Sequence, residues 1–494
     1  MRNKTLFQFF HWYYPPEHRL WEHAAREAAH LARLGITAVW LPPACKGSEG
    51  HRSFGYDCYD LYDLGEFDQK GSVATMFGTR GEYLEAIRAF HEQHMSVYAD
   101  IILNHKGGAD EMEEVSVHKV DPENRKKVIS DPYKIKARTK FTFPGRQGKY
   151  SSFIWDFHCF SGVGRDENTG EYGVYKILNE YGSEWEDLIE EEKGNFDYLM
   201  LSDIEFRNPA VREELGKWGV WYLQNTEVDG FRLDAVKHMP ASFYRDWLAH
   251  LRATSGKELF AVGEYWKSEN IDPMLSYIKA TEGGMSLFDT PLHHNFSKAS
   301  HEGARYDLRK IFDHALVKTD PGHSVTFVDN HDTQPLRQFD SHTESWFRPH
   351  AYALILLREG GYPCVFFPDL YGAAYHDKMP DGKVHAAELD PCPGLEKLLQ
   401  ARREYAYGLQ KDYFDDPHTI GWVREGEPGK NSGCAVLLSN AGEGVKEMET
   451  GKHHAGKTFN DITGNRQDKV TADAEGRASF PVNAGSIAVW IPEG

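Results

Sequence analysis

Three acidic residues follow short apolar segments, each near the point where a predicted strand ends. They are Asp234 after GFRL, Glu264 after AVG, and Asp332 at the end of FVDNHD. Carboxylates that converge without lysines to offset them repel one another, which a fold tolerates where a cation or a reaction needs them. Paired carboxyl groups with cationic and histidine donors beside them suit the hydrolysis of a glycosidic bond with retention of configuration. We therefore expect a site of that chemistry here.

The neighbours of each acid indicate how the work could be divided. Arg232 precedes Asp234 by two residues on a strand, so both side chains point to the same face, and the guanidinium favours an ionised nucleophile. A Tyr-Trp pair follows Glu264, and a partly apolar setting favours the neutral acid that donates a proton. Asp332 is suited to holding sugar hydroxyls and a developing positive charge. Taken singly, each residue has an ordinary interpretation as a helix cap or an ion-pair partner.

An alternation of strands and helices must position these acids. The apolar segments that predict strands are 5–10, 36–41, 97–103, 227–233, 258–263, 285–289, 324–328 and 363–367. The segments with helical periodicity are 20–34, 80–94, 209–225, 240–254, 304–317 and 349–358. Repeated strand–helix units predict a parallel sheet covered by helices, and eight of them suggest a closed (β/α)8 TIM barrel. Active sites of such barrels lie at the carboxyl ends of the strands.

Two regions interrupt this alternation. Residues 105–208 are polar and irregular, which predicts an inserted, loop-rich domain after the third strand. Near the C-terminus, CAVLLSN and GSIAVWIP are separated by turn-rich sequence, which predicts an antiparallel β domain. We therefore expect a catalytic barrel of residues 1–104 and 209–396, an insert at 105–208, and a C-terminal β-sandwich domain at 397–494.

Four stretches occur in a fixed order along the chain: DIILNH, GFRLDAVKH, VGEYW and FVDNHD. Together they resemble the four signature regions of the alpha-amylase family of retaining alpha-glucan hydrolases. The insert resembles domain B of that family and the C-terminal domain resembles its domain C, so the resemblance spans essentially the whole chain. Within the family, QFFHWYYP, GYDCYDLYDLGEFDQKGSVATMFGTR and NFDYLM are similar to bacterial liquefying-type and cytoplasmic alpha-amylases.

The resemblance implies a role for individual residues. Asp234 matches the nucleophile, Glu264 the acid/base and Asp332 the transition-state stabiliser. The residues that match sugar-binding positions are Tyr56, His105, Arg232 and His331 around the cleaved bond, and Lys237 and His238 toward the leaving group.

The resemblance also implies one structural Ca²⁺ between the insert and the barrel. Its ligands match Asn104, Asp197, Asp203 and His238, the last through its main-chain carbonyl, and oxygen ligands of this kind suit Ca²⁺. Secreted relatives often add further cations in the same insert. We expect none here, because the positions of several of their aspartates are taken by Gly164, Glu186, Glu205 and Arg207.

Composition excludes several other functions. The chain has 56 Lys and Arg against 75 Asp and Glu, a formal charge of −19, so it repels a nucleic-acid backbone. We find no run of 18 apolar residues that would predict a membrane span. The six cysteines form no C-x-x-C pair, which argues against a cysteine zinc site. Since the N-terminal segment also lacks the pattern of a secretory signal, we expect a cytoplasmic protein.

The activity we expect is endo-hydrolysis of alpha-1,4 bonds in starch, glycogen and maltodextrins. A related alpha-glucanotransferase or an oligosaccharide-trimming alpha-glucosidase is the alternative among enzymes, and the Lys237-His238 pair argues for an alpha-amylase, because exo-glucosidases of the family usually depart from it. A catalytically silent glycan-binding member is a further alternative, against which the three intact acids argue. The substrate is the only partner that the sequence indicates. The sequence does not predict an oligomeric state.

Overall fold

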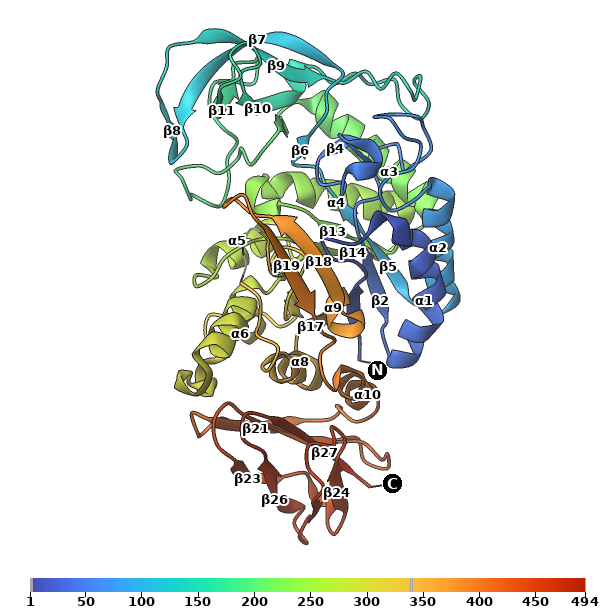
Figure 1. Ribbon diagram of the computed structural model, residues 1–494, viewed down its shortest axis with the longest axis vertical. Coiled ribbons are helices and arrows are strands. Elements are labelled where there is room, and N and C mark those ends of the chain that lie inside the picture. The colour runs from blue at the N-terminus through green and yellow to red at the C-terminus, as the bar shows by residue number, and fades with distance from the viewer. Residues whose placement is uncertain (1–2, 338, 340, 494) are drawn as a thin grey trace.

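Eight parallel strands close into a barrel at the centre of the molecule (Figure 1), a computed structural model that describes residues 3–337, 339 and 341–493. In chain order the strands are β1 (Leu6–Gln8), β2 (Ala38–Leu41), β5 (Ser96–Ile101), β13 (Gly230–Leu233), β14 (Phe260–Gly263), β15 (Ser286–Phe288), β16 (Ser324–Phe327) and β17 (Tyr362–Phe366). Strand β17 closes the barrel on β1, with Cys364 opposite Leu6. The predicted TIM barrel is confirmed: seven of the predicted strands are present in a somewhat shorter form, and the eighth, β17, is shifted by one residue.

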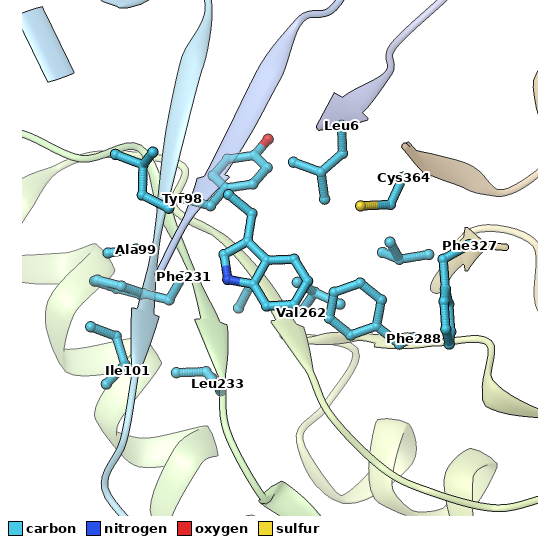
Figure 2. Close-up of a cluster of buried hydrophobic side chains, with 14 of the residues drawn as sticks. Leu6, Tyr98, Ala99, Ile101, Phe231, Leu233, Val262, Phe288, Phe327 and Cys364 are labelled. Carbon is cyan, nitrogen blue, oxygen red and sulfur yellow. The ribbon is translucent and has the colours of Figure 1, made fainter. Parts of the chain in front are cut away.

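Alternation along the strands separates the inside of the barrel from its helical coat. Arg232 lies opposite Asp100 in the β13–β5 ladder, and both point inward with Trp40 of β2, whose indole donates to Asp100. Phe231 and Leu233 lie on the other face of β13, and the Phe231 ring packs against Trp247. Figure 2 shows Phe231 and Leu233 among other buried side chains of the barrel strands. The barrel therefore directs polar groups inward on the same strands that bury apolar groups outward.

Helices cover the outside of the barrel. The helices of four or more residues are α1 (Leu20–Leu34), α2 (Arg80–Glu92), α3 (Pro209–Thr226), α4 (Ala241–Ser255), α5 (Asp272–Ala280), α6 (Thr290–Glu302), α7 (Leu316–Thr319), α8 (Arg348–Leu357), α9 (Phe367–Tyr371) and α10 (Leu395–Glu404). Local signals set their ends: Gly35 terminates α1 at φ 95°, and the Asn208 side chain accepts a hydrogen bond from Ala210 at the start of α3. Among the described residues, no helix combines the length and apolar character needed to cross a membrane.

The predicted helix at 304–317 is wrong. The helix that follows β15 is α6, and residues 303–315 contain only two short 3₁₀ turns before α7. The sequence of α6, TPLHHNFSKASHE, has little apolar periodicity because its buried face includes His293 and Ser300. Periodicity of apolar residues cannot detect a helix whose buried face is partly polar.

The insert contains more regular structure than a loop-rich domain. Its strands β6 (His105–Lys106), β7 (Glu111–Asp121), β8 (Asn124–Val128), β9 (Tyr133–Lys140), β10 (Phe160–Arg165), β11 (Tyr172–Ile177) and β12 (Ser202–Ile204) form one antiparallel sheet. The lysine-rich segment of β9 alternates exposed lysines with buried Ile135 and Ala137, as in a half-buried strand. Strand β12 pairs with β6, so the two ends of the insert meet, with Asp203 opposite His105.

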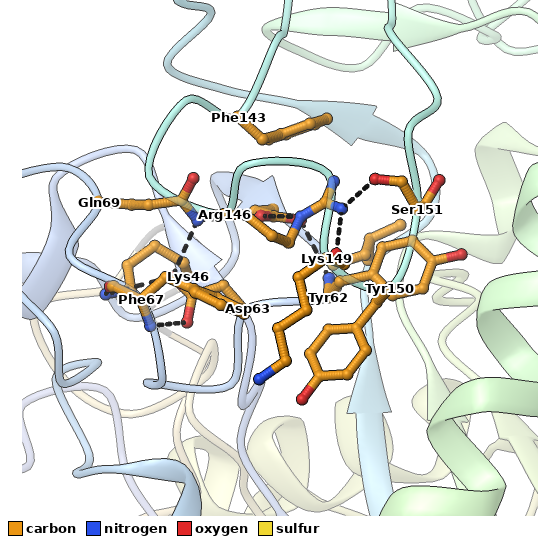
Figure 3. Close-up of polar contacts among 12 residues, drawn as sticks. Lys46, Tyr62, Asp63, Phe67, Gln69, Phe143, Arg146, Lys149, Tyr150 and Ser151 are labelled. Atoms are coloured by element: carbon orange, nitrogen blue, oxygen red, sulfur yellow. Dashed lines mark hydrogen bonds and ion pairs between the residues drawn. The ribbon is translucent and has the colours of Figure 1, made fainter.

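Buried polar contacts attach the insert to the barrel loop that follows β4 (Cys58–Asp60) (Figure 3). Arg146 of the insert donates to Asp60 at 2.9 Å, and both side chains are at most 2% exposed. The same guanidinium also donates to the carbonyl of Lys149 at 2.6 Å. A buried ion pair with its remaining donors satisfied holds the insert in one orientation on the barrel.

The C-terminal residues form two antiparallel sheets. The larger contains β20 (Gln410–Tyr413), β21 (Thr419–Arg424), β22 (Cys434–Ser439), β27 (Ile487–Pro492), β24 (Thr458–Asp461) and β25 (Lys469–Thr471), and the smaller pairs β23 (Gly444–Glu449) with β26 (Arg477–Val482). Helix α10 runs across the expected boundary at residue 396, and its Arg402 donates to the carbonyls of Lys4 and Leu356. We therefore propose that the C-terminal domain begins after Glu404. The hairpin of β18 (Ala373–Lys378) and β19 (Val384–Leu389) is an addition that the sequence did not predict.

Asp289 should be a strong determinant of stability. It is fully buried at the end of β15, caps α6 through Leu292, and also accepts from Leu316, Val317 and Ser324. Because Asp289→Ala leaves these donors without an acceptor, we expect a loss of about 3 kcal/mol and a clearly lower Tm.

The control is Asp307→Ala, which removes the cap of an exposed 3₁₀ turn. It should change the Tm much less than Asp289→Ala. Equal Tm values for the two variants in thermal unfolding by circular dichroism would contradict the role of Asp289.

Candidate active site

One buried guanidinium organises the acids at the carboxyl ends of the barrel strands. Arg232 is 1% exposed, and its Nη1 donates to Asp100 Oδ1 at 2.8 Å and to Asp234 Oδ1 at 2.7 Å. Its Nη2 donates to Glu264 Oε2 at 2.6 Å. Asp234 and Glu264 are thus held by two nitrogens of the same planar group, which fixes their relative position.

The acids remain accessible although Arg232 does not. The side chains of Asp234, Glu264 and Asp332 are 10%, 11% and 17% exposed, against 1% for Arg232. A substrate can therefore contact the carboxylates while the guanidinium that holds them stays out of water.

Asp100 is a member of this site that the sequence analysis did not single out. It accepts hydrogen bonds from Tyr56 Oη at 2.8 Å and from Trp40 Nε1 at 3.0 Å, in addition to that from Arg232. Burial raises the pKa of Asp100 to about 6. A signal was present, because Asp100 is a charged residue within the apolar segment 97–103.

From the sequence we expected Arg232 to keep Asp234 ionised, but other groups also act on the pKa of Asp234. Burial raises the pKa of Asp234 well above its usual value, and the negative charges of Glu264 and Asp100 act in the same direction. The Arg232 guanidinium opposes this rise but is shared among three carboxylates. Ionised Asp234 is therefore destabilised relative to a solvent-exposed aspartate.

Glu264 is held at both carboxylate oxygens. Oε2 accepts from Arg232, and Oε1 accepts from Trp266 Nε1 at 2.5 Å. Trp266 was expected only as an apolar neighbour, yet it also supplies a hydrogen bond. The two donors leave the Glu264 carboxyl little freedom to rotate.

Asp332 is approached by two donors from its own loop. Arg337 Nη2 lies 3.3 Å from Asp332 Oδ1, and His331 Nε2 lies 3.3 Å from Oδ2. The Arg337 guanidinium also lies over the Trp12 ring, 3.5 Å from its centroid. Arg337 and Trp12 were not singled out from the sequence, although Trp12 lies in the QFFHWYYP stretch after the first predicted strand.

The sugar-binding positions expected around the cleaved bond adjoin this network. The Tyr56 and His331 rings stack at 5.2 Å with an interplanar angle of 12°, and Gln8 donates to His331 Nδ1 at 3.1 Å. His105 Nε2 donates to the Tyr56 carbonyl at 2.7 Å. Burial lowers the pKa of both histidines, so each is a neutral hydrogen-bonding group.

Lys237 and His238 lie at the border with the insert. The Lys237 ammonium donates to Glu192 and to the Trp266 carbonyl, the latter at 3.4 Å. His238 Nδ1 donates to the Phe196 carbonyl at 2.6 Å, and burial lowers its pKa to about 4. Both residues thus connect the loop after β13 with the last part of the insert.

The expected metal ligands lie together at the same border. The Asn104 amide donates to Asp203 Oδ1 at 3.2 Å, and Asp197 Oδ2 accepts from the Glu186 main chain at 3.4 Å. Asn104 Oδ1 and both carboxylate oxygens of Glu186 are buried without a hydrogen-bond partner. Unsatisfied buried oxygens beside further carboxylates are an arrangement that a hard cation would complete.

Lys176 is a further residue that the sequence analysis missed. It is 1% exposed, donates to the Ser161 carbonyl at 3.0 Å and lies 4.0 Å from Glu205 Oε2. Arg207 holds the same Glu205 carboxylate through Nε at 2.7 Å and Nη2 at 2.6 Å. Two cationic side chains therefore neutralise part of the acidic cluster internally.

The chain matches known families over most of its length. Residues 27–375 match the family of the alpha amylase catalytic domain, and residues 434–491 match the alpha-amylase C-terminal family. The chain is 47% identical to the cytoplasmic alpha-amylase of Escherichia coli over 494 residues, covering 100% of this chain and 99% of the relative. It is 49% identical to an alpha-amylase of Geobacillus stearothermophilus, covering 99% and 87%.

A solved structure shows the same fold. The alpha-amylase of Geobacillus thermoleovorans, complexed with acarbose, superposes with a TM-score of 0.63 at 19% identity and covers 96% of this chain and 92% of that one. The four ordered motifs, the barrel and the full-length matches all indicate the same family. The chain belongs to the alpha-amylase family and is a glycoside hydrolase of alpha-1,4-glucans.

Proposed function

We propose that the chain cleaves internal alpha-1,4 bonds of starch, glycogen and maltodextrins with retention of configuration. The observation that carries this proposal is the pairing of Asp234 and Glu264 on the two Nη atoms of Arg232. Retention needs one carboxylate close enough to attack the anomeric carbon while the other protonates the leaving oxygen. A shared guanidinium supplies that proximity.

We propose a separate role for each carboxyl group. Asp234 keeps Oδ2 free of Arg232 and attacks the anomeric carbon, while Glu264 gives its proton to the glycosidic oxygen that departs. Glu264 then takes a proton from water, whose oxygen attacks the same carbon and releases Asp234. Asp332 holds sugar hydroxyls and stabilises the positive charge that develops on the sugar in the transition state of each step.

The remaining residues bind the sugar chain. The Tyr56 ring, backed by His331, offers a flat face for the sugar at the point of cleavage. His105, His331 and Arg232 lie around the same position. Lys237 and His238, which join the barrel to the insert, are placed to contact the leaving part of the glucan.

Product analysis tests the proposal. Incubation with soluble starch should remove the iodine colour while few reducing ends have formed, and proton NMR should show the alpha anomer first. Early glucose with slow loss of colour would favour an oligosaccharide-trimming glucosidase, and cyclic or elongated glucans would favour a glucanotransferase. An initial beta anomer would contradict Asp234 as nucleophile.

Glu264→Gln should lower kcat by about 10²–10⁴-fold, because the amide has no carboxylic proton to donate. The substitution keeps an oxygen that can accept from Trp266, so binding of a maltooligosaccharide, measured by calorimetry, should persist. The matched control is Glu85→Gln on the exposed side of α2, which should retain wild-type turnover. Turnover of Glu264→Gln within about tenfold of wild type would remove Glu264 from the acid/base role.

We further propose that Asn104, Asp197, Asp203 and the His238 carbonyl hold one structural Ca²⁺. Four carboxylates, Asp197, Asp203, Glu186 and Glu205, share this region with two cationic side chains, Lys176 and Arg207. A third cation, Arg125, also acts on Asp197 and Asp203, so the four carboxylates keep a net charge of −1 when ionised, which a single bound cation would offset. Burial raises the pKa of Asp203 and Glu186 well above their usual values, and nearby carboxylates add to the rise.

The same contacts argue against additional cations. Lys176 and Arg207 already neutralise Glu205, and a side chain at Gly164 would lie 2.3 Å from the Tyr198 hydroxyl. No carboxylate can therefore be added at Gly164 without moving Tyr198. These contacts support a single Ca²⁺, as the family resemblance implied.

Removal of the metal should destabilise the protein. Extensive dialysis should leave about one Ca²⁺ per chain, and chelation should lower the Tm, because an ion that binds only the folded state stabilises it by about 2.7 kcal/mol at 100 times its Kd. Asp203→Asn should have a low Tm that chelator does not lower further. The control Asp307→Asn, whose side chain is 23% exposed, should respond as wild type. Two or more tightly bound cations, or an unchanged Tm after complete chelation, would contradict the single site.

We also propose a cytoplasmic location, with internal glucans or imported maltodextrins as substrates. The full-length similarity to a cytoplasmic alpha-amylase supports this, as do the six cysteines, all of which are unpaired and buried. We propose the same division into barrel, insert and C-terminal domain as above, with the last boundary after Glu404.

A further inference from the structure

Two histidines and a glutamate converge at the C-terminal end of α6, on a surface separate from the Arg232 site. His301 belongs to α6, whereas His342 and Glu344 belong to the segment that leads into α8. One potential ligand atom from each lies within 4.8 Å of the others. The side chains are 50%, 30% and 43% exposed, so a dissolved ion can reach them.

Two imidazoles face one carboxylate oxygen. His301 Nε2 and His342 Nε2 lie 3.4 Å and 3.8 Å from Glu344 Oε1. Other imidazole–carboxylate pairs in the described part of the chain range from 2.6 Å to 3.7 Å, so the shared oxygen, rather than either distance, distinguishes this group. Ligands about 2.0–2.2 Å from a tetrahedral Zn²⁺ lie roughly 3.3–3.6 Å from each other. The His301–Glu344 distance is already in this range, and a small side-chain movement would bring His342 into it.

The orientation of His301 is already that of a metal ligand. Its Nδ1 lies 2.8 Å from the Ser297 carbonyl, which only accepts, so Nδ1 carries a hydrogen and Nε2, which faces Glu344, is the nitrogen left to bind a metal. Metal-binding histidines characteristically use their second nitrogen in this way. The Glu344 main chain is fixed in turn, because its N–H donates to Ser300 Oγ at 3.0 Å.

We propose that His301, His342 and Glu344 form a binding site for a transition-metal ion such as Zn²⁺, with water at the remaining position. Two imidazoles and one carboxylate suit Zn²⁺, Ni²⁺ or Co²⁺, whereas Ca²⁺ takes oxygen ligands. The ion would join the end of α6 to the segment 342–344. Thr343 donates to Asp329, so this segment is tied to the loop that carries Asp332.

The test uses the full chain without a polyhistidine tag, saturated with Ca²⁺. Titration with Zn²⁺ against a chromophoric chelator should reveal one site in the wild type, and Co²⁺ should give the intense visible bands of four-coordinate geometry. His301→Ala and Glu344→Gln should each weaken Zn²⁺ binding by more than about tenfold, the least that loss of a ligand should cost. Zn²⁺ should raise the Tm of the wild type but not of Glu344→Gln.

The matched control is His385→Ala, which removes an equally exposed histidine from a direct pair with Asp381. It should bind Zn²⁺ as the wild type does. All variants are first checked for native circular dichroism. Wild-type Zn²⁺ affinity in His301→Ala, or equal loss in His385→Ala, would overturn the proposal.

Discussion

A single buried positive charge determines how the catalytic end of the barrel is arranged. Arg232 cannot give up its proton, and in the barrel interior it must be neutralised by groups that reach it from other strands. Asp100, Asp234 and Glu264 do so from β5, the end of β13 and the end of β14. Because three negative charges surround one positive charge, the carboxylates are neither fully compensated nor free to move. Reactive carboxyl groups need this combination of fixed geometry and incomplete neutralisation.

A related balance of charge occurs where the insert meets the barrel. The side chains of Lys176 and Arg207 offset part of the negative charge of the buried acids. In our proposal a metal ion offsets the rest. The Arg146–Asp60 pair fixes the other side of the insert. Burying charge is costly, so these contacts define one orientation of the insert more than they increase stability. That orientation brings Glu192 and Phe196 to Lys237 and His238.

Much of the fold could be predicted from the sequence because the barrel strands are short, uninterrupted apolar segments. Helix α6 could not, because polar His293 and Ser300 lie on its buried face. The strand-end acids could be predicted from their positions, but their roles depended on the family resemblance. Asp100 and Lys176 were missed because each lies inside a strand and acts through partners distant in sequence. Arg337 was missed because loop residues carry no periodicity that reveals which group they contact.

The pairing of β6 with β12 gives the insert a modular attachment. His105 and Asp203 are 98 positions apart in the chain, yet they are direct partners in an antiparallel ladder, with Cα atoms about 5 Å apart. For the geometry of the barrel, the segment between these two residues is equivalent to the loop of a hairpin, because it leaves and returns at adjacent positions. Its length and content can change without altering the spacing of the barrel strands, provided that this ladder is kept. Insertions and exchanges within this segment are therefore an evolutionary route by which one barrel can acquire different substrate-facing walls.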